Sequence, residues 1–442
     1  MMMRRGGGAV IVCAMMVCCV TSAARSVSAD EIALRFSLRP GLSESVLMEK
    51  AADGGFLLAG SIGKAYHERA WCMKLDAFGG TQWRAMYGDG GHAYNVRGLQ
   101  ETRDGGAVVA GLANVGESDL SHGWVMKIAP GGAIEWQRGY SVGECGGFED
   151  VKVVDGGRLV LTGGTVYSQN LDATENIEVM EVWLVQLDTS GEPLWSKVYL
   201  DAGEGRCVDL GADGGFVVVA TNRVLRVDGH GEITWARRYD GPGLEVFRGI
   251  RKTKEGGYLV WGENLSRVGE VADGVILKLD PSGNPQWQTL VGGRSEDWLF
   301  SLDQADTGAF VLAGTTSSFE SWFRPWLLKI ADDGTAIWQR IYSGPAILGS
   351  AQAVRAIPGG GFITAGVLSG NKITFTLHSF TGELTACPKL YTRVQGGSAP
   401  IEMTVRDLEC RASSLAVTHM PTKARRLPLT VRTAPLCERS GS

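Results

Sequence analysis

Residues 53–60 read Asp-Gly-Gly-Phe-Leu-Leu-Ala-Gly, and this stretch decides the fold because the chain repeats it. An acidic residue, glycines and an apolar run return at intervals of 42 to 58 residues. The further copies begin at Asp104, Asp155, Asp213 and Glu255, with weaker ones at Asp306 and Gly359. Self-similarity at such an interval indicates a solenoid, a propeller or another repeat architecture.

A second marker follows each copy, a turn segment with a tryptophan four residues after its glycine. The tryptophans are Trp83, Trp136, Trp195, Trp235, Trp287 and Trp338. The seventh unit departs from the pattern, since Gly382 is followed four places later by Ala386. We predict that the six tryptophans are structural and lie in the walls between neighbouring units.

Each unit reads as four short strands. In the sixth unit, apolar runs at 298–304, 309–314, 326–330 and 336–342 are separated by turn-forming residues. Units of about 50 residues with four strands are typical of propeller blades. We therefore predict an all-β protein, a β-propeller of about seven four-stranded blades over residues 30–386, with a linear β-solenoid as the competing architecture. The repeats are expected to start near residues 44, 93, 145, 206, 243, 294 and 347.

The segment 32–38, before the first unit, reads as an extra strand. It is similar to the fourth strand of a unit that lacks its beginning. We expect it to pair into the last blade, so that the two ends of the repeat region complete one sheet. A ring closed in this way has no exposed strand edge along its seam.

Residues 1–29 have the pattern of a secretory signal peptide. Two arginines precede an apolar stretch from 9 to 20, and small residues lead to Ala29. The stretch is shorter than the about 20 residues of a membrane-spanning helix. We predict cleavage after Ala29 and a secreted or periplasmic protein with no transmembrane segment. Acylation of Cys18 or Cys19, giving lipid or surface attachment, is the alternative.

The chain after residue 29 is mildly acidic. The leader holds three of the 43 Lys and Arg residues and no acid, which leaves 40 against 48 Asp and Glu, a net charge of −8. This balance argues against general nucleic-acid binding. The partner expected from the charge and the compartment is a protein or a glycan of the cell envelope.

From Cys387 onward the repeat is lost, although short β-like runs remain. We predict a small C-terminal β appendage over residues 387–442, with Cys387 and Cys437 as a candidate disulfide that would stabilise it. Six cysteines follow residue 29 without a Cys/His cluster of zinc type. We therefore predict no bound metal and no cofactor.

The units resemble a broad group of bacterial secreted propeller repeat proteins. The resemblance rests on residues 53–60, on 183–188 (Trp-Leu-Val-Gln-Leu-Asp) and on 338–342 (Trp-Gln-Arg-Ile-Tyr), and it covers roughly residues 32–386. It implies the fold and little about activity, because such a fold hosts many functions. The tryptophan segments are also weakly similar to the docking motif of quinoprotein dehydrogenases. Those enzymes use an adjacent cysteine pair, which occurs here only in the signal segment.

In a four-stranded blade the tight turns lie on one face of the ring and the remaining loops on the other. The loops expected on this second face vary in length, which is how a rigid scaffold usually carries a binding site. Their aromatic, histidine and arginine side chains suit a contact surface. The candidate ligand-binding residues are Tyr66, His67, Arg69, His92, Tyr94, His122, Trp322, Phe323 and Arg324.

No constellation of catalytic type occurs, whether a G-x-S-x-G turn, a metal-binding histidine pair or paired carboxylates. The acidic segment with Asp172, Glu175, Glu178 and Glu181 is interpreted as a solvated insertion, with a Ca²⁺ loop as the alternative. The sequence therefore favours a non-enzymatic binding or scaffolding propeller. The rival hypothesis is a propeller enzyme, either a polysaccharide hydrolase or lyase or a quinone-dependent oxidoreductase.

Overall fold

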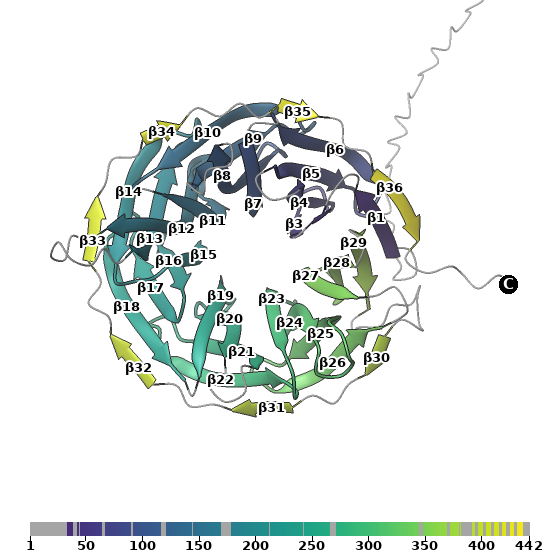
Figure 1. Ribbon diagram of the computed structural model, residues 1–442. Coiled ribbons are helices and arrows are strands. Elements are labelled where there is room, and N and C mark those ends of the chain that lie inside the picture. Colours follow the sequence, from purple (N-terminus) through teal and green to yellow (C-terminus); the bar gives the residue numbers. More distant parts are fainter. Residues whose placement is uncertain are drawn as a thin grey trace, which may run out of the picture.

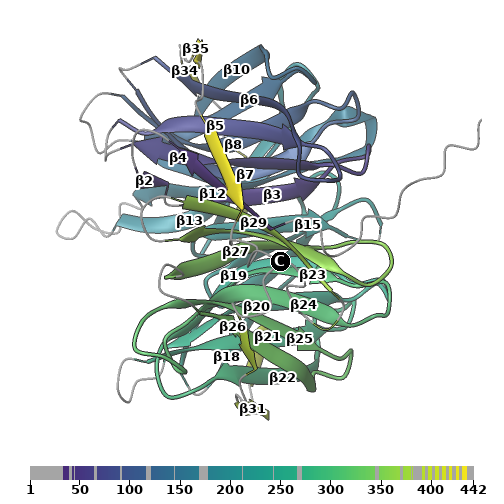
Figure 2. The same cartoon turned by 90° about the vertical axis from the view of Figure 1, so that its right-hand side faces the viewer.

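The computed structural model describes residues 33–38, 42–43, 45–63, 67–89, 92–115, 121–143, 145–168, 178–211, 213–241, 243–265, 271–343, 348–368, 372–379 and 381, together with seven short strands between 391 and 435. Seven sheets stand around a central axis, which confirms the seven-bladed β-propeller (Figure 1). Figure 2 shows the same ring from the side. In this part of the chain only η1 (Asp155–Gly157) is helical.

Each blade is an antiparallel meander of four strands that are ordered outward from the axis. The inner strands are β2 (Leu42–Ser43) with β3 (Leu47–Lys50), β7 (His92–Glu101), β11 (Gly146–Val153), β15 (Gly205–Leu210), β19 (Leu244–Lys252), β23 (Asp297–Gln304) and β27 (Gly349–Ala356). The second strands are β4 (Phe56–Gly63), β8 (Ala107–Val115), β12 (Leu159–Ser168), β16 (Phe216–Ala220), β20 (Tyr258–Leu265), β24 (Phe310–Thr316) and β28 (Phe362–Leu368). The third strands are β5 (Arg69–Leu75), β9 (Ser121–Ile128), β13 (Glu178–Leu187), β17 (Arg223–Val227), β21 (Ala272–Leu279), β25 (Arg324–Ile330) and β29 (Lys372–His378). The fourth strands are β6 (Thr81–Gly88), β10 (Ile134–Ser141), β14 (Pro193–Leu200), β18 (Ile233–Asp240), β22 (Pro285–Gly292), β26 (Ala336–Tyr342) and β1 (Ala33–Leu38).

The N-terminal strand β1 completes blade 7 and closes the ring. It pairs antiparallel with β29, with Phe36 opposite Ile373. The prediction that a strand at 32–38 enters the last blade is therefore confirmed. Because the first and last strands of the repeat region share one sheet, the seam of the ring is held by a continuous ladder of backbone hydrogen bonds.

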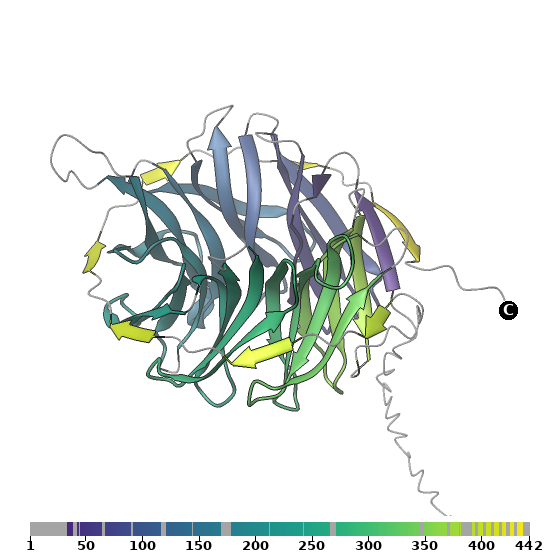
Figure 3. The same ribbon diagram turned by 60° about the horizontal axis from the view of Figure 1, so that its bottom comes forward.

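The chain after the seventh unit forms a belt around the outside of the ring (Figures 1 and 3). Each belt strand pairs antiparallel with the outermost strand of one blade, and the belt follows the blades in the order 6, 5, 4, 3, 2, 1 and 7. The tail is thus β-structured, and it is spread over the circumference. The belt strands are β30 (Tyr391–Arg393), β31 (Gly397–Pro400), β32 (Thr404–Asp407), β33 (Arg411–Ser414), β34 (Thr418–Met420), β35 (Arg425–Leu427) and β36 (Val431–Pro435).

The glycine pair of the repeat forms the turn between the first two strands of a blade. In the first copy Gly54 has φ +84°, a conformation that side chains rarely adopt. A Cβ on Gly55 would lie 2.2 Å from the carbonyl oxygen of Leu75. The carboxylate of Asp53 accepts hydrogen bonds from the N–H of Gly55 and from Lys74 Nζ, both at 2.9 Å. The motif therefore encodes the turn and fastens it to the third strand.

The glycine that ends the motif lies opposite a β-bulge in the inner strand. In blade 3 the register shifts between Phe148 and Asp150, opposite Gly163 in β12. A Cβ on Gly163 would lie 1.8 Å from the carbonyl oxygen of Gly147. The inner strands of blades 2 to 7 all shift at this position, although blade 4 has Ala220 opposite the shift. The bulge adds one residue to each inner strand and turns its side chain towards the axis.

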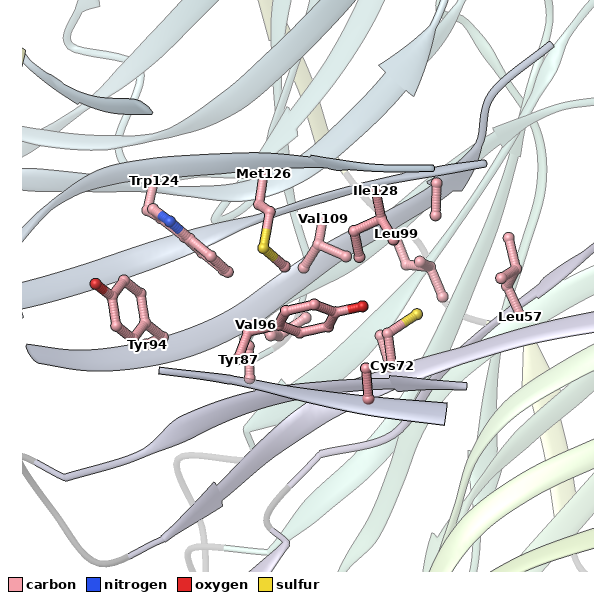
Figure 4. Close-up of a cluster of buried hydrophobic side chains, with 14 of the residues drawn as sticks. Leu57, Cys72, Tyr87, Tyr94, Val96, Leu99, Val109, Trp124, Met126 and Ile128 are labelled. Carbon is pink, nitrogen blue, oxygen red and sulfur yellow. The ribbon is translucent and has the colours of Figure 1, made fainter. Parts of the chain in front are cut away.

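Hydrophobic side chains fill the spaces between neighbouring blades. Between blades 1 and 2, Cys72 and Tyr87 of the first face Tyr94, Trp124 and Met126 of the second (Figure 4). Clusters of the same kind join the other blades in sequence around the ring. Because each cluster draws on two blades, one unit alone has no core, as in other repeat proteins.

Five of the six repeat tryptophans lie where one blade meets the turn of the next, and the sixth, Trp338, stacks on Phe362 of blade 7. A Cβ on Gly132 of blade 2 would lie 2.8 Å from the ring of Trp83 in blade 1. Trp287 Nε1 donates a hydrogen bond to the carbonyl oxygen of Asp332 in the following blade, at 2.8 Å. The hydroxyl of Tyr87, four residues after Trp83, donates to the carbonyl oxygen of Gly132 at 2.9 Å. Tyrosines of blades 2, 3 and 4 repeat this bond.

At the junction of blades 6 and 7 a buried histidine takes part in the contact. The Nδ1 of His378 lies 3.1 Å from the Tyr342 hydroxyl, and its Nε2 lies 2.9 Å from the hydroxyls of Thr364 and Thr376. The imidazole stacks on Phe362, with ring centroids 4.8 Å apart. Burial lowers the pKa of His378 to about 3. The imidazole of His378 is therefore uncharged in the folded protein at neutral pH.

We expect the wild-type protein to lose stability more steeply with falling pH than the variant His378→Gln. The unfolded chain binds a proton at this side chain near pH 6.5, whereas the native state does so only at about pH 3. Stability therefore falls as the pH drops through this window, by about 2 kcal/mol at pH 5 relative to pH 7. Urea unfolding of both proteins at the two pH values measures the difference. Equal losses in the two proteins would contradict the assignment.

Candidate functional site

The bulge of each inner strand directs one side chain into the central channel. We term these residues the upper tier, since they lie towards the face that carries the loops between second and third strands. The same structural position thus places three arginines around one opening. In blades 2 to 7 the upper tier consists of Arg97, Glu149, Arg206, Arg248, Phe300 and Gln352.

Three residues further along, each inner strand contributes one side chain to a second tier, which we term the charge ring. Its members, in blade order, are Glu49, Gln100, Lys152, Asp209, Arg251, Asp303 and Arg355. From blade 3 to blade 7 the charges alternate, and the acid of blade 1 continues the alternation. Three acids and three bases make the ring electrically neutral as a whole.

Ion pairs join neighbouring members of the charge ring. Arg355 Nε donates to Glu49 Oε2 at 2.9 Å, and an Arg251 N–H donates to Asp303 Oδ1 at 2.6 Å. Burial alone would raise the pKa of Glu49, but Arg355, Lys152 and Arg251 hold it below its usual value. The ring therefore depends on complete pairing, because a buried charge that loses its partner is costly.

The channel encloses a chamber of about 160 Å³ between the two tiers. A wider hollow of about 500 Å³ lies below the charge ring, on the face of the tight turns. Glu49, Lys152 and Arg251 line both spaces, so the charge ring separates them. A ligand that approaches from the loop face meets the arginines first.

Another hollow of the turn face, of about 640 Å³, lies over blades 2 to 4. Two pairs of its polar side chains contact each other, since Arg103 pairs with Asp155 at 3.2 Å and an Arg158 N–H lies 3.5 Å from Gln186 Oε1.

The arginines at the mouth remain accessible. The side chains of Arg97, Arg206 and Arg248 are 43%, 34% and 41% exposed. Each has a carboxylate neighbour, Glu149 at 3.9 Å, Glu204 at 2.5 Å and Glu263 at 2.8 Å, respectively. A guanidinium carries five N–H donors, so one carboxylate does not saturate it. The mouth can thus donate hydrogen bonds to an incoming polar or anionic group.

Aromatic side chains of blade 6 extend from this mouth to the loop surface. The ring centroid of Phe300, in the upper tier, lies 6.5 Å from that of Trp298. The Trp298 centroid in turn lies 5.2 Å from that of Phe323. Trp322, the neighbour of Phe323 in the chain, is 67% exposed. We term these four residues the aromatic patch. The predicted contact residue Arg324 is largely buried and pairs with Glu320 at 2.7 Å, so it holds the loop in place.

The predicted residues of the N-terminal half meet at the junction of blades 1 and 2. His67 is exposed, while Arg69 and His92 are half-buried. The backbone N–H of Tyr94 donates to the carbonyl oxygen of Glu68 at 2.9 Å and ties the two blades together. Tyr66 lies outside the described residues, so its role stays a prediction.

Tyr94 and His122 are buried, in contrast to the expectation that they offer contact area. Tyr94 has no exposed surface and packs on Trp124, with ring centroids 4.9 Å apart. His122 is 4% exposed, and burial followed by the nearby His92 lowers its pKa. His92 itself lies 2.6 Å from Asp89 through Nδ1. The reason is local, because these side chains lie on the buried faces of strands β7 and β9. The positions of the loops along the chain did not reveal which faces are buried.

The remaining predicted features fall partly outside the description. Cys387 and Cys437 lie outside it, and no disulfide joins any two of the described cysteines Cys72, Cys145 and Cys207. In the acidic segment Glu181 is buried and accepts backbone hydrogen bonds from Asp201 and Ala202, rather than facing solvent. Among the residues that the structure describes, no group of three or more His, Cys, Asp or Glu side chains is close enough together to hold a metal ion. Within the same residues no helix has the length and apolar character to cross a membrane.

Sequence reasoning missed the two tiers of the channel. A signal for the charge ring does exist, since each member stands three or four residues before its Asp-Gly-Gly turn, and the sign of its charge alternates along the later copies. No sequence pattern identifies the arginines of the upper tier, because the bulge that directs them into the channel is a feature of the backbone. The aromatic patch was found in part, through Trp322 and Phe323.

No protein-family model matches the chain, and no curated protein matches it. Among solved structures the chain is similar to Sqt1 from Chaetomium thermophilum, at 13% identity over 83% of this chain and 89% of that chain, with a TM-score of 0.48. It is also similar to a protein of unknown function from Bacteroides caccae, at 10% identity over 70% and 93%, with a TM-score of 0.40. Virginiamycin B lyase from Staphylococcus aureus gives 11% identity over 64% and 83%, with a TM-score of 0.41. At these identities the likeness concerns the propeller fold alone.

Proposed function

We propose that this protein is a non-enzymatic binding propeller that acts outside the cytoplasm and engages a protein or another cell-envelope ligand through its loop face. The observation that carries the proposal is the combination, at one mouth of the channel, of three accessible arginines with the aromatic patch. Arginine and tryptophan dominate the energetics of protein interfaces, because they combine large contact area with polar groups. The leader-like residues 1–29 support the compartment.

The geometry also suggests how such a ligand would be oriented. Its apolar part would lie on Trp322 and Phe323, and its polar or anionic part would point towards Arg206 and Arg248. The ligand would not pass through the ring, because the charge ring closes the channel below the chamber. The loop face is therefore a one-sided binding surface on a rigid scaffold.

Trp322→Ala is expected to weaken capture of the envelope partner about thirty-fold, since a central tryptophan contributes roughly 2 kcal/mol. The measurement is affinity capture from envelope extract by the immobilised full chain, with the partner identified by mass spectrometry and its dissociation constant then determined for each variant. Arg206→Ala combined with Arg248→Ala is expected to weaken the same interaction.

Ile337→Ala is the matched control. Ile337 is 52% exposed and follows the Asp333-Gly334 turn, so it lies on the opposite face of the ring. Its removal should leave the captured partner and the affinity unchanged. Capture that is equal for Trp322→Ala and wild type, or that depends on Ile337 instead, would reject the loop face as the binding surface.

A further inference from the structure

Two carboxylates of neighbouring blades approach the same glycine. Asp297, the first residue of β23, has no exposed surface, and Asp273 lies in β21 of the preceding blade. A Cβ on Gly292 would lie 2.5 Å from Asp297 Oδ2 and 2.6 Å from Asp273 Oδ1. Both oxygens therefore crowd Gly292 from two blades, and they lie close enough together for one group to contact both.

The hydrogen bonds of Asp297 are incomplete. Its Oδ2 accepts hydrogen bonds from the N–H of Gly293 at 2.8 Å and from the Ser318 hydroxyl at 2.6 Å. Its Oδ1 is buried and accepts no hydrogen bond of normal geometry among the described residues, while the nearby Thr316 hydroxyl acts to lower the pKa of the carboxyl group. A fully buried carboxylate oxygen without a partner is unusual, because buried polar atoms nearly always bind a protein group, water or an ion.

The negative charge of the pair is also uncompensated. Across the described residues no Lys, Arg or His lies within ion-pair distance of either carboxylate, in contrast to the pairs of the charge ring. Burial, and then the proximity of Asp297, raise the pKa of Asp273 to about 6, and burial raises the pKa of Asp297. Buried charges in proteins are normally paired or coordinate metals.

We propose that Asp273 and Asp297 bind a calcium ion at the junction of blades 5 and 6. Bonds from Ca²⁺ to oxygen measure about 2.3–2.6 Å, so one ion placed between Asp273 Oδ1 and the carboxylate of Asp297 contacts both. Backbone carbonyl groups and water complete its shell, as is usual for this hard cation. Mg²⁺ fits less well, because it demands a near-octahedral shell and gives up its water reluctantly.

The site sits beside the aromatic patch. Asp297 directly precedes Trp298, and the Ser318 hydroxyl that binds Asp297 also accepts the N–H of Ser295 at 2.9 Å. A cation held here thus fixes the two chain segments that lead into the loop of Trp322. Two carboxylates are few for a calcium site, which sets the expected dissociation constant at about 10⁻⁴–10⁻³ M, the range of extracellular calcium modules.

The test is thermal unfolding of the full chain at pH 7.5, first in EDTA and then with 5 mM CaCl₂ or 5 mM MgCl₂, at about five to fifty times the expected dissociation constant. Calcium is expected to raise the Tm of the wild type by about 1–3 °C, and magnesium by less. Native mass spectrometry should show one bound Ca²⁺ per chain. Asp273 is half-buried, so Asp273→Asn is expected to fold, to lose the calcium shift and to lose the bound ion.

Asp306→Asn is the control, since Asp306 is an exposed acid on the turn face whose only described ion pair, with Lys254, is 3.5 Å long. It should keep the full calcium response. The proposal is overturned if calcium leaves the wild-type Tm unchanged, or if Asp273→Asn responds as the wild type does. A wild type that is stabilised by lowering the pH to 6 but not by calcium would show that the two carboxylates share a proton instead.

Discussion

Arg355→Met is expected to destabilise the folded protein by about 3–5 kcal/mol, the cost of breaking a buried ion pair from one side. Arg355 and Glu49 are each 12% exposed, and their contact joins blade 7 to blade 1. Without the guanidinium, Glu49 keeps only weaker neighbours and must be protonated or remain as a buried unpaired charge. Equilibrium unfolding in urea measures the loss.

A second substitution makes this test specific to the pair. Adding Glu49→Leu to Arg355→Met removes the orphaned charge, so the double variant is expected to regain most of the lost stability, since a buried pair replaced by apolar residues is often neutral. The coupling energy from the double-mutant cycle should exceed 1 kcal/mol, within the range of about 0.5–3 kcal/mol for residues in contact. Additive losses would show that the charge ring does not act as a connected unit.

Gly163→Ala is expected to cost about 3 kcal/mol, the upper part of the range for forcing extra atoms into a packed site. The new Cβ would lie 1.8 Å from the carbonyl oxygen of Gly147, a backbone atom that cannot move without shifting the inner strand β11. That strand carries Glu149 and Lys152 into the channel. The substitution should therefore disturb the mouth of the channel as well as stability.

Gly131→Ala serves as the control for Gly163→Ala. A Cβ there meets no atom within 4 Å, and the residue has no positive φ. Its expected effect ranges from none to a gain of about 1 kcal/mol, because alanine has less freedom than glycine in the unfolded chain. Thermal unfolding of both variants under one condition compares them. A Gly163→Ala variant that is as stable as Gly131→Ala would mean that the bulge tolerates a side chain.

The sequence predicts the parts of this fold that depend on neighbouring residues alone. A turn such as Asp53-Gly54-Gly55 needs only its own residues, and each copy of it predicts a hairpin. The tryptophan of the fourth strand stands at a fixed distance from its turn for the same reason. Seven copies of these local signals were enough to predict seven blades and the closing strand β1.

The parts that were missed depend on residues brought together by the ring. Asp273 and Asp297 lie on different blades, so no spacing along the chain marks them as a pair. The burial of Tyr94 and His122 follows from which face of each strand packs inside the ring, and the positions of the loops along the chain do not show this face. The belt escaped prediction because its strands are three to five residues long and have no repeat of their own.

The route of the belt also sets the order in which the molecule is completed. The blades follow one another around the axis from 1 to 7, whereas the tail travels back from blade 6 to blade 1 before its last strand joins β1 in blade 7. The first and last strands of the described chain thus become neighbours only after the chain has been synthesised as far as β36. A chain that stops before the belt lacks the strands that cover the outer edge of each blade, and exposed strand edges of this kind favour pairing with other chains.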